Sequence, residues 1–156
     1  MKIPLTQGKY AIVGPRDYAH LMQWKWYYSK NRKTGYARRN SSGPNRRAIR
    51  MHRVILERMG YKDFAKSDHV NGKGLDNRRC NLRPATNPQN GWNQGVQSNN
   101  TSGYKGVYWY KPTKKWRAQI KVNKKKIYLG YFDDIEDAVN AYNKAAIKYH
   151  GEFARI

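Results

Sequence analysis

The chain has 156 residues and a formal net charge of +22, and it contains 13 tyrosines and five tryptophans. This aromatic content excludes a disordered basic tail, and the length allows one domain or two small ones. A charge this large would destabilise a compact fold by self-repulsion, so it predicts a polyanionic partner such as double-stranded DNA.

Cysteine content and hydropathy exclude several other classes. Cys80 is the single cysteine, so the chain can form no intramolecular disulfide and no four-cysteine zinc site, and we expect no disulfide-linked partner. No apolar run approaches the length of a membrane span, and the N-terminus lacks the apolar core of a signal peptide. These features predict a soluble, cytoplasmic protein without a membrane partner.

The first sixty residues predict short strands and two helices. Strands are expected over residues 9–13, 24–28, 36–39 and 46–50, with a hairpin turn at 31–35. Helices are expected over residues 18–23 and 51–59, the second ended by Gly60. His52, on the second helix, either lies near a metal centre or is packed and hydrogen-bonded, as single helical histidines more often are.

The strands of this region are rich in arginine. Arginines on one sheet could contact DNA phosphates, although a solvated sheet face explains any single one of them equally well. The candidates are Arg38, Arg39, Arg46, Arg47 and Arg50.

A polar segment from Ser67 to Asn90 predicts a strand, a loop, a second strand and a helix. Residues 68–70 and 81–83 could pair as strands around a loop too rich in Gly, Asn and Asp for a helix. Asn87 can then cap a helix, and Pro88 suits its first turn.

This segment has the residue types for metal-assisted phosphodiester hydrolysis. An Asp and an Asn offer hard oxygens to Mg²⁺, which usually keeps several waters. A neutral His beside them can take a proton from a water that attacks phosphorus. The alternative is that Asp68 and His69 are adjacent by chance and that the Asn-rich turn satisfies its own backbone.

The segment resembles the HNH (His-Me finger, ββα-metal) nucleases, especially phage and intron-encoded homing endonucleases. The resemblance implies that His69 is the general base, that Asn81 holds the His69 ring, and that Asp68 and Asn90 bind one Mg²⁺ or Mn²⁺. Asn90 stands where the name-giving motif ends in His. The matching residues are Asp68-His69, Asn71-Gly72, Asn77, Asn81-Leu82-Arg83 and Asn90.

The C-terminal third predicts a small sheet packed on one helix. Three runs near residues 107–110, 116–122 and 126–129 alternate between apolar and basic or polar residues, with Val107 and Trp109 expected on the apolar face. Asp133 and Asp134 can cap a helix that Gly151 ends. Its apolar stripe, expected to cover the sheet, is Ile135, Ala138, Val139, Tyr142, Ala145, Ala146 and Tyr149.

This module resembles the plant ethylene-response-factor (apetala-type) DNA-binding domain. The matching runs are 103–107, 115–120, 127–133 and 136–146. Tyr or Lys replaces several family arginines, which favours contacts with phosphates over bidentate guanine readout. The alternation and the resemblance together give these candidate DNA-binding residues: Lys105, Tyr108, Tyr110, Arg117, Gln119, Lys121, Lys126 and Tyr128.

The sequence as a whole predicts an α+β protein: an HNH, ββα-metal nuclease domain over residues 1–94, a linker over 95–103 and an ethylene-response-factor-like domain over 104–156. The expected function is site-specific cleavage or nicking of duplex DNA by a monomer, as in a homing endonuclease of a phage or mobile element. Two alternatives are a DNA-binding transcriptional regulator without cleavage activity and a dimeric restriction enzyme.

Overall fold

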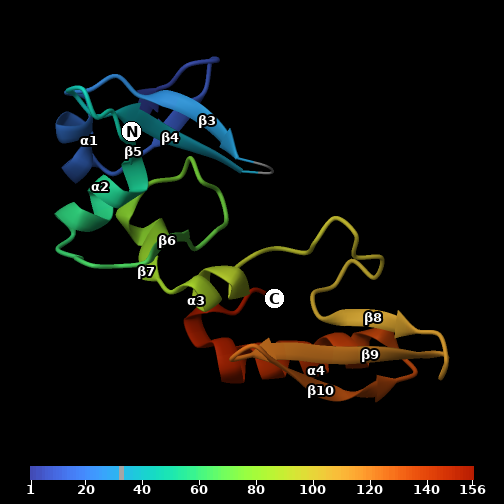
Figure 1. The fold of residues 1–156 in the computed structure, drawn as a ribbon. Coiled ribbons are helices and arrows are strands. Elements are labelled where there is room, and N and C mark those ends of the chain that lie inside the picture. The colour runs from blue at the N-terminus through green and yellow to red at the C-terminus, as the bar shows by residue number, and fades with distance from the viewer. Residues whose placement is uncertain (32–33) are drawn as a thin grey trace. The chain divides into compact units, whose positions relative to one another are not determined.

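The computed structural model describes residues 1–31 and 34–156, and it divides into two compact units, Met1–Asn87 and Pro88–Ile156 (Figure 1). Both units combine strands and helices, as the predicted α+β class requires. The division falls before the predicted linker at residues 95–103. None of the helices in the described part of the chain has the length and apolar character needed to cross a membrane.

In its described residues, 1–31 and 34–87, the first unit contains two two-stranded hairpins, a three-stranded antiparallel sheet in the order β3-β4-β5, and two helices. One hairpin pairs β1 with β2 and the other pairs β6 with β7, both antiparallel. The elements are β1 (Lys2–Pro4), β2 (Tyr10–Ile12), α1 (Pro15–Leu21), β3 (Tyr27–Asn31), β4 (Thr34–Asn40), β5 (Ala48–Arg50), α2 (Met51–Arg58), β6 (Lys66–His69), the 3-10 turn η1 (Arg79–Asn81) and β7 (Leu82–Ala85).

Two predicted elements of this unit begin three residues away from their predicted starts, and the other differences in starting residue are smaller. Helix α1 starts at Pro15 rather than at residue 18, because the fixed φ of proline suits the first helical position. Strand β3 starts at Tyr27 rather than at residue 24, because Trp26 enters the core and its indole N–H donates to the Leu21 carbonyl at 2.8 Å. The turn predicted at residues 31–35 includes positions 32 and 33, outside the described residues.

A buried carboxylate joins three segments of the first unit. Asp17 on α1 is fully buried, and its oxygens accept hydrogen bonds from Arg58 at the end of α2 and from Arg79 in η1, at 2.7–2.9 Å. These hydrogen bonds, with that from Arg79 the largest cause, lower the pKa of Asp17. Asp17 therefore fixes η1, and with it the start of β7, against the two helices.

The second unit has the predicted sheet and helix. Its antiparallel sheet, in the order β10-β9-β8, consists of β8 (Val107–Tyr110), β9 (Lys115–Val122) and β10 (Lys125–Phe132). Helix α4 (Ile135–His150) lies along one face of the sheet (Figure 1), and the short α3 (Asn87–Trp92) precedes the sheet in the chain. The Asp134 side chain caps α4 by accepting from the Glu136 N–H at 2.6 Å, as predicted.

The apolar faces of the sheet and of α4 mostly match the prediction. Their shared core contains Val107, Ala118, Ile120, Ala138, Tyr142, Ala145 and Ala146. Tyr149 was wrongly assigned to the stripe, because it is 38 % exposed and the next residue, His150, is buried instead. Trp109 is also exposed, and it packs edge-on against its strand partner Trp116 with ring centroids 5.2 Å apart.

Candidate active site and nucleic-acid interface

Asp68 and His69 end strand β6, where the β6–β7 hairpin buries both side chains. Asp68 lies opposite Arg83 on β7, and His69 lies opposite Leu82. The exposed fractions are 4 % for Asp68 and 6 % for His69. The hairpin thus brings the predicted metal ligand and the predicted base to adjacent, water-poor positions.

Asp68 is ion-paired across the hairpin. The Nε and guanidinium NH2 groups of Arg83 both lie 2.8 Å from Oδ2 of Asp68. The Arg83 side chain is itself only 13 % exposed, so the pair is largely shielded from solvent. The two contacts with Arg83 therefore hold the Asp68 carboxylate in place across the hairpin.

The His69 imidazole is held among aromatic rings and one asparagine. Nε2 of His69 lies 3.3 Å from Oδ1 of Asn77. The ring centroid lies 5.1 Å from that of His52 on α2 and 5.8 Å from that of Tyr36 on β4. Burial lowers the pKa of His69, against the smaller raising effects of the Asn77 hydrogen bond and nearby carboxylates. The ring is therefore neutral at pH 7, as a general base must be.

His52 has the packed environment that the sequence left as one of two possibilities. It is 5 % exposed, and its ring makes edge contacts with both Tyr36 and His69. Burial lowers its pKa to about 3. The His52 ring is therefore neutral at pH 7, and it packs against the His69 ring.

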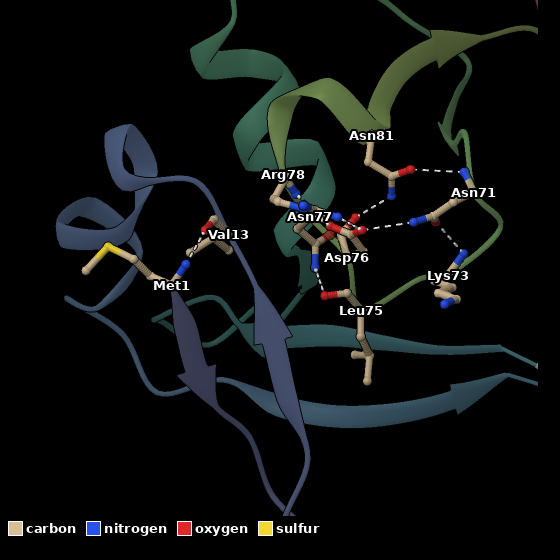
Figure 2. A network of polar contacts seen from close by, with 9 residues as sticks. All are labelled: Met1, Val13, Asn71, Lys73, Leu75, Asp76, Asn77, Arg78 and Asn81. Atoms are coloured by element: carbon tan, nitrogen blue, oxygen red, sulfur yellow. Dashed lines mark hydrogen bonds and ion pairs between the residues drawn. The ribbon is translucent and has the colours of Figure 1, made fainter.

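A polar network orders the loop between β6 and β7 (Figure 2). Asn81 receives the Asn71 backbone N–H on its side-chain oxygen at 2.9 Å and donates its amide to the Asp76 carbonyl at 2.7 Å. The Asp76 carboxylate accepts from the Asn71 amide at 2.9 Å and from Arg78 at 2.7 and 2.8 Å. These contacts lower the pKa of Asp76 to about 2, and the hydrogen bond from the Arg78 side chain is the largest cause. The loop is thus built around one charged carboxylate.

The hydrogen bonds described for Asn77 and Asn81 assign these two side chains to different neighbours. The hydrogen bonds described for the Asn81 side chain go to loop backbone, and the side-chain oxygen beside the His69 ring belongs to Asn77. The Asn77 N–H donates to the Ile12 carbonyl at 2.7 Å, which fixes Asn77 to strand β2. Ring-holding by Asn81 stays a prediction, and Asn77 is a neighbour of the base to which the sequence assigned no role.

The two predicted metal ligands belong to different units: Asp68 to the first and Asn90, on α3, to the second. Their pairing therefore stays a prediction. A carboxylate and an amide oxygen suit Mg²⁺, because this ion takes oxygen ligands and keeps several waters. Within residues 1–31 and 34–156 there is no group of three or more His, Cys, Asp or Glu side chains that could hold a metal ion.

The outer face of the second sheet gathers five of the predicted DNA-binding residues. The Arg117 guanidinium lies over three tyrosine rings, at 4.6 Å from Tyr108, 4.5 Å from Tyr110 and 5.3 Å from Tyr128. The Tyr108 hydroxyl donates to Gln119 at 2.8 Å. In the described part of the chain, the buried Nε of Arg117 has no hydrogen-bond partner. The face is thus a preformed layer of aromatic rings around one cation.

Tyr131 also belongs to this face, although the alternating pattern did not predict it. The pairing of β10 with β9 shifts between Tyr128 and Gly130, so that Tyr131 pairs with Arg117. The Tyr131 ring lies 5.4 Å from that of Tyr110. A glycine inside a strand is a signal for such a bulge, and Gly130 has φ +138°.

The remaining predicted DNA-binding residues are in different settings. Lys121 and Lys126 are exposed cross-strand partners. Lys105 is not presented on the sheet, because its ammonium donates to the carbonyls of Trp92 and Gln94. In the first unit, the Arg39 guanidinium stacks over Trp24 at 4.3 Å, and Arg38 is its half-buried neighbour on β4.

Comparisons with known proteins identify a domain in the C-terminal third of the chain. Residues 102–152 match the AP2 domain. An AP2-like ethylene-responsive transcription factor of Arabidopsis thaliana is 36 % identical over 75 residues, which are 48 % of this chain and 15 % of that protein. The APETALA2-like protein 2 of rice, Oryza sativa subsp. indica, is 43 % identical over 56 residues, 36 % of this chain and 13 % of that protein. The chain thus spans under a sixth of these plant relatives.

One relative is similar over most of its own length. Protein 3.8 of Escherichia phage T7 is 34 % identical over 89 residues, which are 57 % of this chain and 73 % of the phage protein. The chain therefore belongs to the family of phage T7 protein 3.8 and has an AP2 DNA-binding domain in its C-terminal part.

Proposed function

We propose that the protein is a metal-dependent DNA endonuclease of the HNH, ββα-metal type, and that its AP2 domain tethers the nuclease unit to duplex DNA. The main support is the His69 site. A buried, neutral imidazole lies beside the ion-paired carboxylate of Asp68, on a hairpin that is followed in the chain by a helix with Asn90. A protein that only binds DNA has no need of this arrangement.

In this mechanism the His69 imidazole accepts a proton from a water molecule. The water oxygen forms a bond to phosphorus while the bond between phosphorus and one ester oxygen breaks, and that oxygen leaves with the bonding electron pair. Asn77 holds Nε2 of His69, which leaves Nδ1 as the nitrogen that takes the proton when Nε2 is protonated. Asn81 orders the loop that contains Asn77.

Asp68 and Asn90 would hold one Mg²⁺ or Mn²⁺ ion through their oxygens, together with water. The bound ion would supply charge stabilisation at the phosphate and the leaving oxygen. Arg83, paired with Asp68, keeps the carboxylate oriented in the hairpin. We propose Mg²⁺ as the working ion because both ligands are hard oxygens.

We also propose that cleavage is site-specific and that the protein acts as a monomer. When one of two DNA-binding units on a chain is bound, the local concentration of the other at the DNA rises. Two modest sequence preferences can therefore combine into a usable site specificity. Such a linear arrangement suits an asymmetric site, as a homing endonuclease requires.

The test is cleavage of supercoiled plasmids and phage DNA with Mg²⁺, with Mn²⁺ and with a chelator. We expect cleavage only with metal, and we expect His69→Ala to slow it by about 10²- to 10⁴-fold, the usual contribution of a general base. DNA affinity measured in chelator should not change, because His69 is buried. A His69→Ala variant that cuts at the wild-type rate would remove His69 as the base.

A second candidate is a DNA-binding regulator without cleavage activity, which the match of residues 102–152 to the AP2 domain supports. The same assay separates the two functions. DNA that stays intact with Mg²⁺ and Mn²⁺ over a wide range of sequences, while binding is retained, would favour the regulator.

A further inference from the structure

We infer that the AP2 domain holds helix α3 through a Trp92–His150 stack and a Lys105 clamp, and thereby positions Asn90. The docking of α3 stands on its own contacts. The role of Asn90 as a metal ligand rests on the proposed function. In this inference Trp92, Lys105 and His150 are positioning residues for the cleavage reaction.

The first contact is aromatic. The rings of Trp92 and His150 are stacked, with centroids 4.4 Å apart and planes at 8°. His150 is the last residue of α4 and is 6 % exposed, and its Nε2 lies 3.1 Å from the Lys121 carbonyl of β9. The His150 ring is therefore fixed by both the helix and the sheet of the AP2 domain before it meets Trp92.

The second contact is polar. The Lys105 ammonium donates to the backbone carbonyls of Trp92 and Gln94, the latter at 2.8 Å. These carbonyls are at the C-terminal end of α3, where a helix leaves acceptors unsatisfied and favours a cation. Burial lowers the pKa of Lys105 to about 8, and the half-buried side chain is directed to the end of α3 by its two hydrogen bonds.

Helix α3 depends on these contacts because it has little stability of its own. It has six residues, none of them fully buried, and isolated helices this short do not persist in water. Pro88, Gly91 and Trp92 also form one wall of a cavity of about 800 Å³, with other walls from β9 and α4. The anchors Lys105 and His150 are both within residues 102–152, the part that matches the AP2 domain.

The docking determines which way Asn90 faces. Asn90 and Trp92 are two residues apart, which is about 200° around a helix. With Trp92 turned toward His150, Asn90 is on the opposite side of α3 from the stack. Contacts of the AP2 domain therefore fix the orientation of a residue in the nuclease motif.

The docking can be tested without cleavage. We would measure hydrogen exchange of residues 88–94 in the full chain for Trp92→Ala, Lys105→Met and His150→Ala. Exchange should become about ten-fold faster or more than in the wild type. Trp92→Phe should restore protection, and Tyr149→Ala, a change to an exposed aromatic on α4, should not alter it. Wild-type exchange rates in all three variants would overturn the docking.

The positioning role is tested by the metal dependence of cleavage in the same variants. Misplacing a ligand through its supporting residues should raise the Mn²⁺ concentration for half-maximal cleavage by about 10- to 100-fold, with no change for Tyr149→Ala. Faster exchange with an unchanged Mn²⁺ requirement would overturn the positioning role. A wild-type protein that does not cleave at all would remove that role together with the proposed function, whereas hydrogen exchange would still decide the docking.

Discussion

His69 is buried, and this determines the pH range in which it can act as a base. Desolvation disfavours the charged imidazolium, and His52 on one side of the ring is neutral as well. The Asn77 oxygen opposes the shift but is outweighed. His69 therefore titrates below the usual histidine value of about 6.5, and a bound divalent cation would lower its pKa further.

This pKa shift predicts the acid limb of the cleavage rate. Because the base acts when neutral, we expect the acid limb of the rate with saturating Mg²⁺ to be centred below pH 6.5, the usual histidine value. The measurement is a single-turnover rate from pH 5 to 8, with circular dichroism at each pH to show that the fold persists. An acid limb centred above pH 6.5 would contradict a desolvated His69.

The partners of single residues were the hardest part to predict. The sequence places Asn77 and Asn81 in one polar loop, but it does not show that Asn77 is bonded to Ile12 on a distant strand. Lys105 is predicted to contact DNA because of its place in the family motif, and this stays a prediction; its ammonium donates to carbonyls 11 and 13 residues earlier. In both cases the contact joins separated segments of the chain, and such contacts leave no periodic signal.

At the scale of elements, periodic patterns predicted well and short segments did not. Strands β9 and β10 and helix α4 follow their alternating or helical stripes, because each has one face on the core of the second unit. Strand β1, with three residues, is too short for any pattern. The bulge at Gly130 moved Tyr131 to the outer face by changing the register within one strand.

The buried ion pairs of Asp17 lead to a prediction about the stability of the first unit. Asp17→Asn would remove the charge that holds Arg58 and Arg79 and leave a buried polar group. Both arginines are about one-third exposed, so we expect a loss of about 2–3 kcal/mol in the free energy of unfolding at pH 7, less than for a fully buried pair. Urea unfolding followed by circular dichroism measures this loss.

The pH dependence and a control make the Asp17 test specific. Its folded pKa is lowered, so its stabilisation is present above the unfolded pKa of about 3.9 and is lost as the pH falls through the folded value. The difference between wild type and Asp17→Asn should therefore shrink below about pH 4. Glu57→Gln, at an exposed carboxylate of α2, should change little, and an equal loss in both variants would contradict the account.

At the scale of the whole molecule, positive charge is concentrated in the first unit. Residues 1–87 contain 20 Lys and Arg and five Asp and Glu, whereas residues 88–156 contain 12 and five. The AP2 domain therefore supplies a shaped aromatic face and a smaller share of the charge. We therefore expect the first unit to supply most of the attraction for phosphates, which is independent of sequence.

This distribution predicts how binding depends on salt. Each phosphate contact contributes about −0.9 to the slope of log affinity against log salt, so replacing the exposed Arg46 and Arg47 by Gln should reduce the slope by about 1.8. Fluorescence anisotropy in chelator from 50 to 300 mM salt would measure it. Replacing both by Lys keeps the charge and should keep the slope. An unchanged slope in the Gln variant would exclude these arginines from the interface.

The placement of α3 also matters for anyone who exchanges DNA-binding modules between proteins. A chimera that receives only the part of this chain from residue 102 onward, where the AP2 match begins, would lack Trp92. Lys105 and His150 would then have lost their partner on α3. A junction ahead of Asn87, the first residue of α3, keeps the helix with its own anchors. The transplantable segment of this protein is therefore longer than the family match, by a stretch that the match does not include.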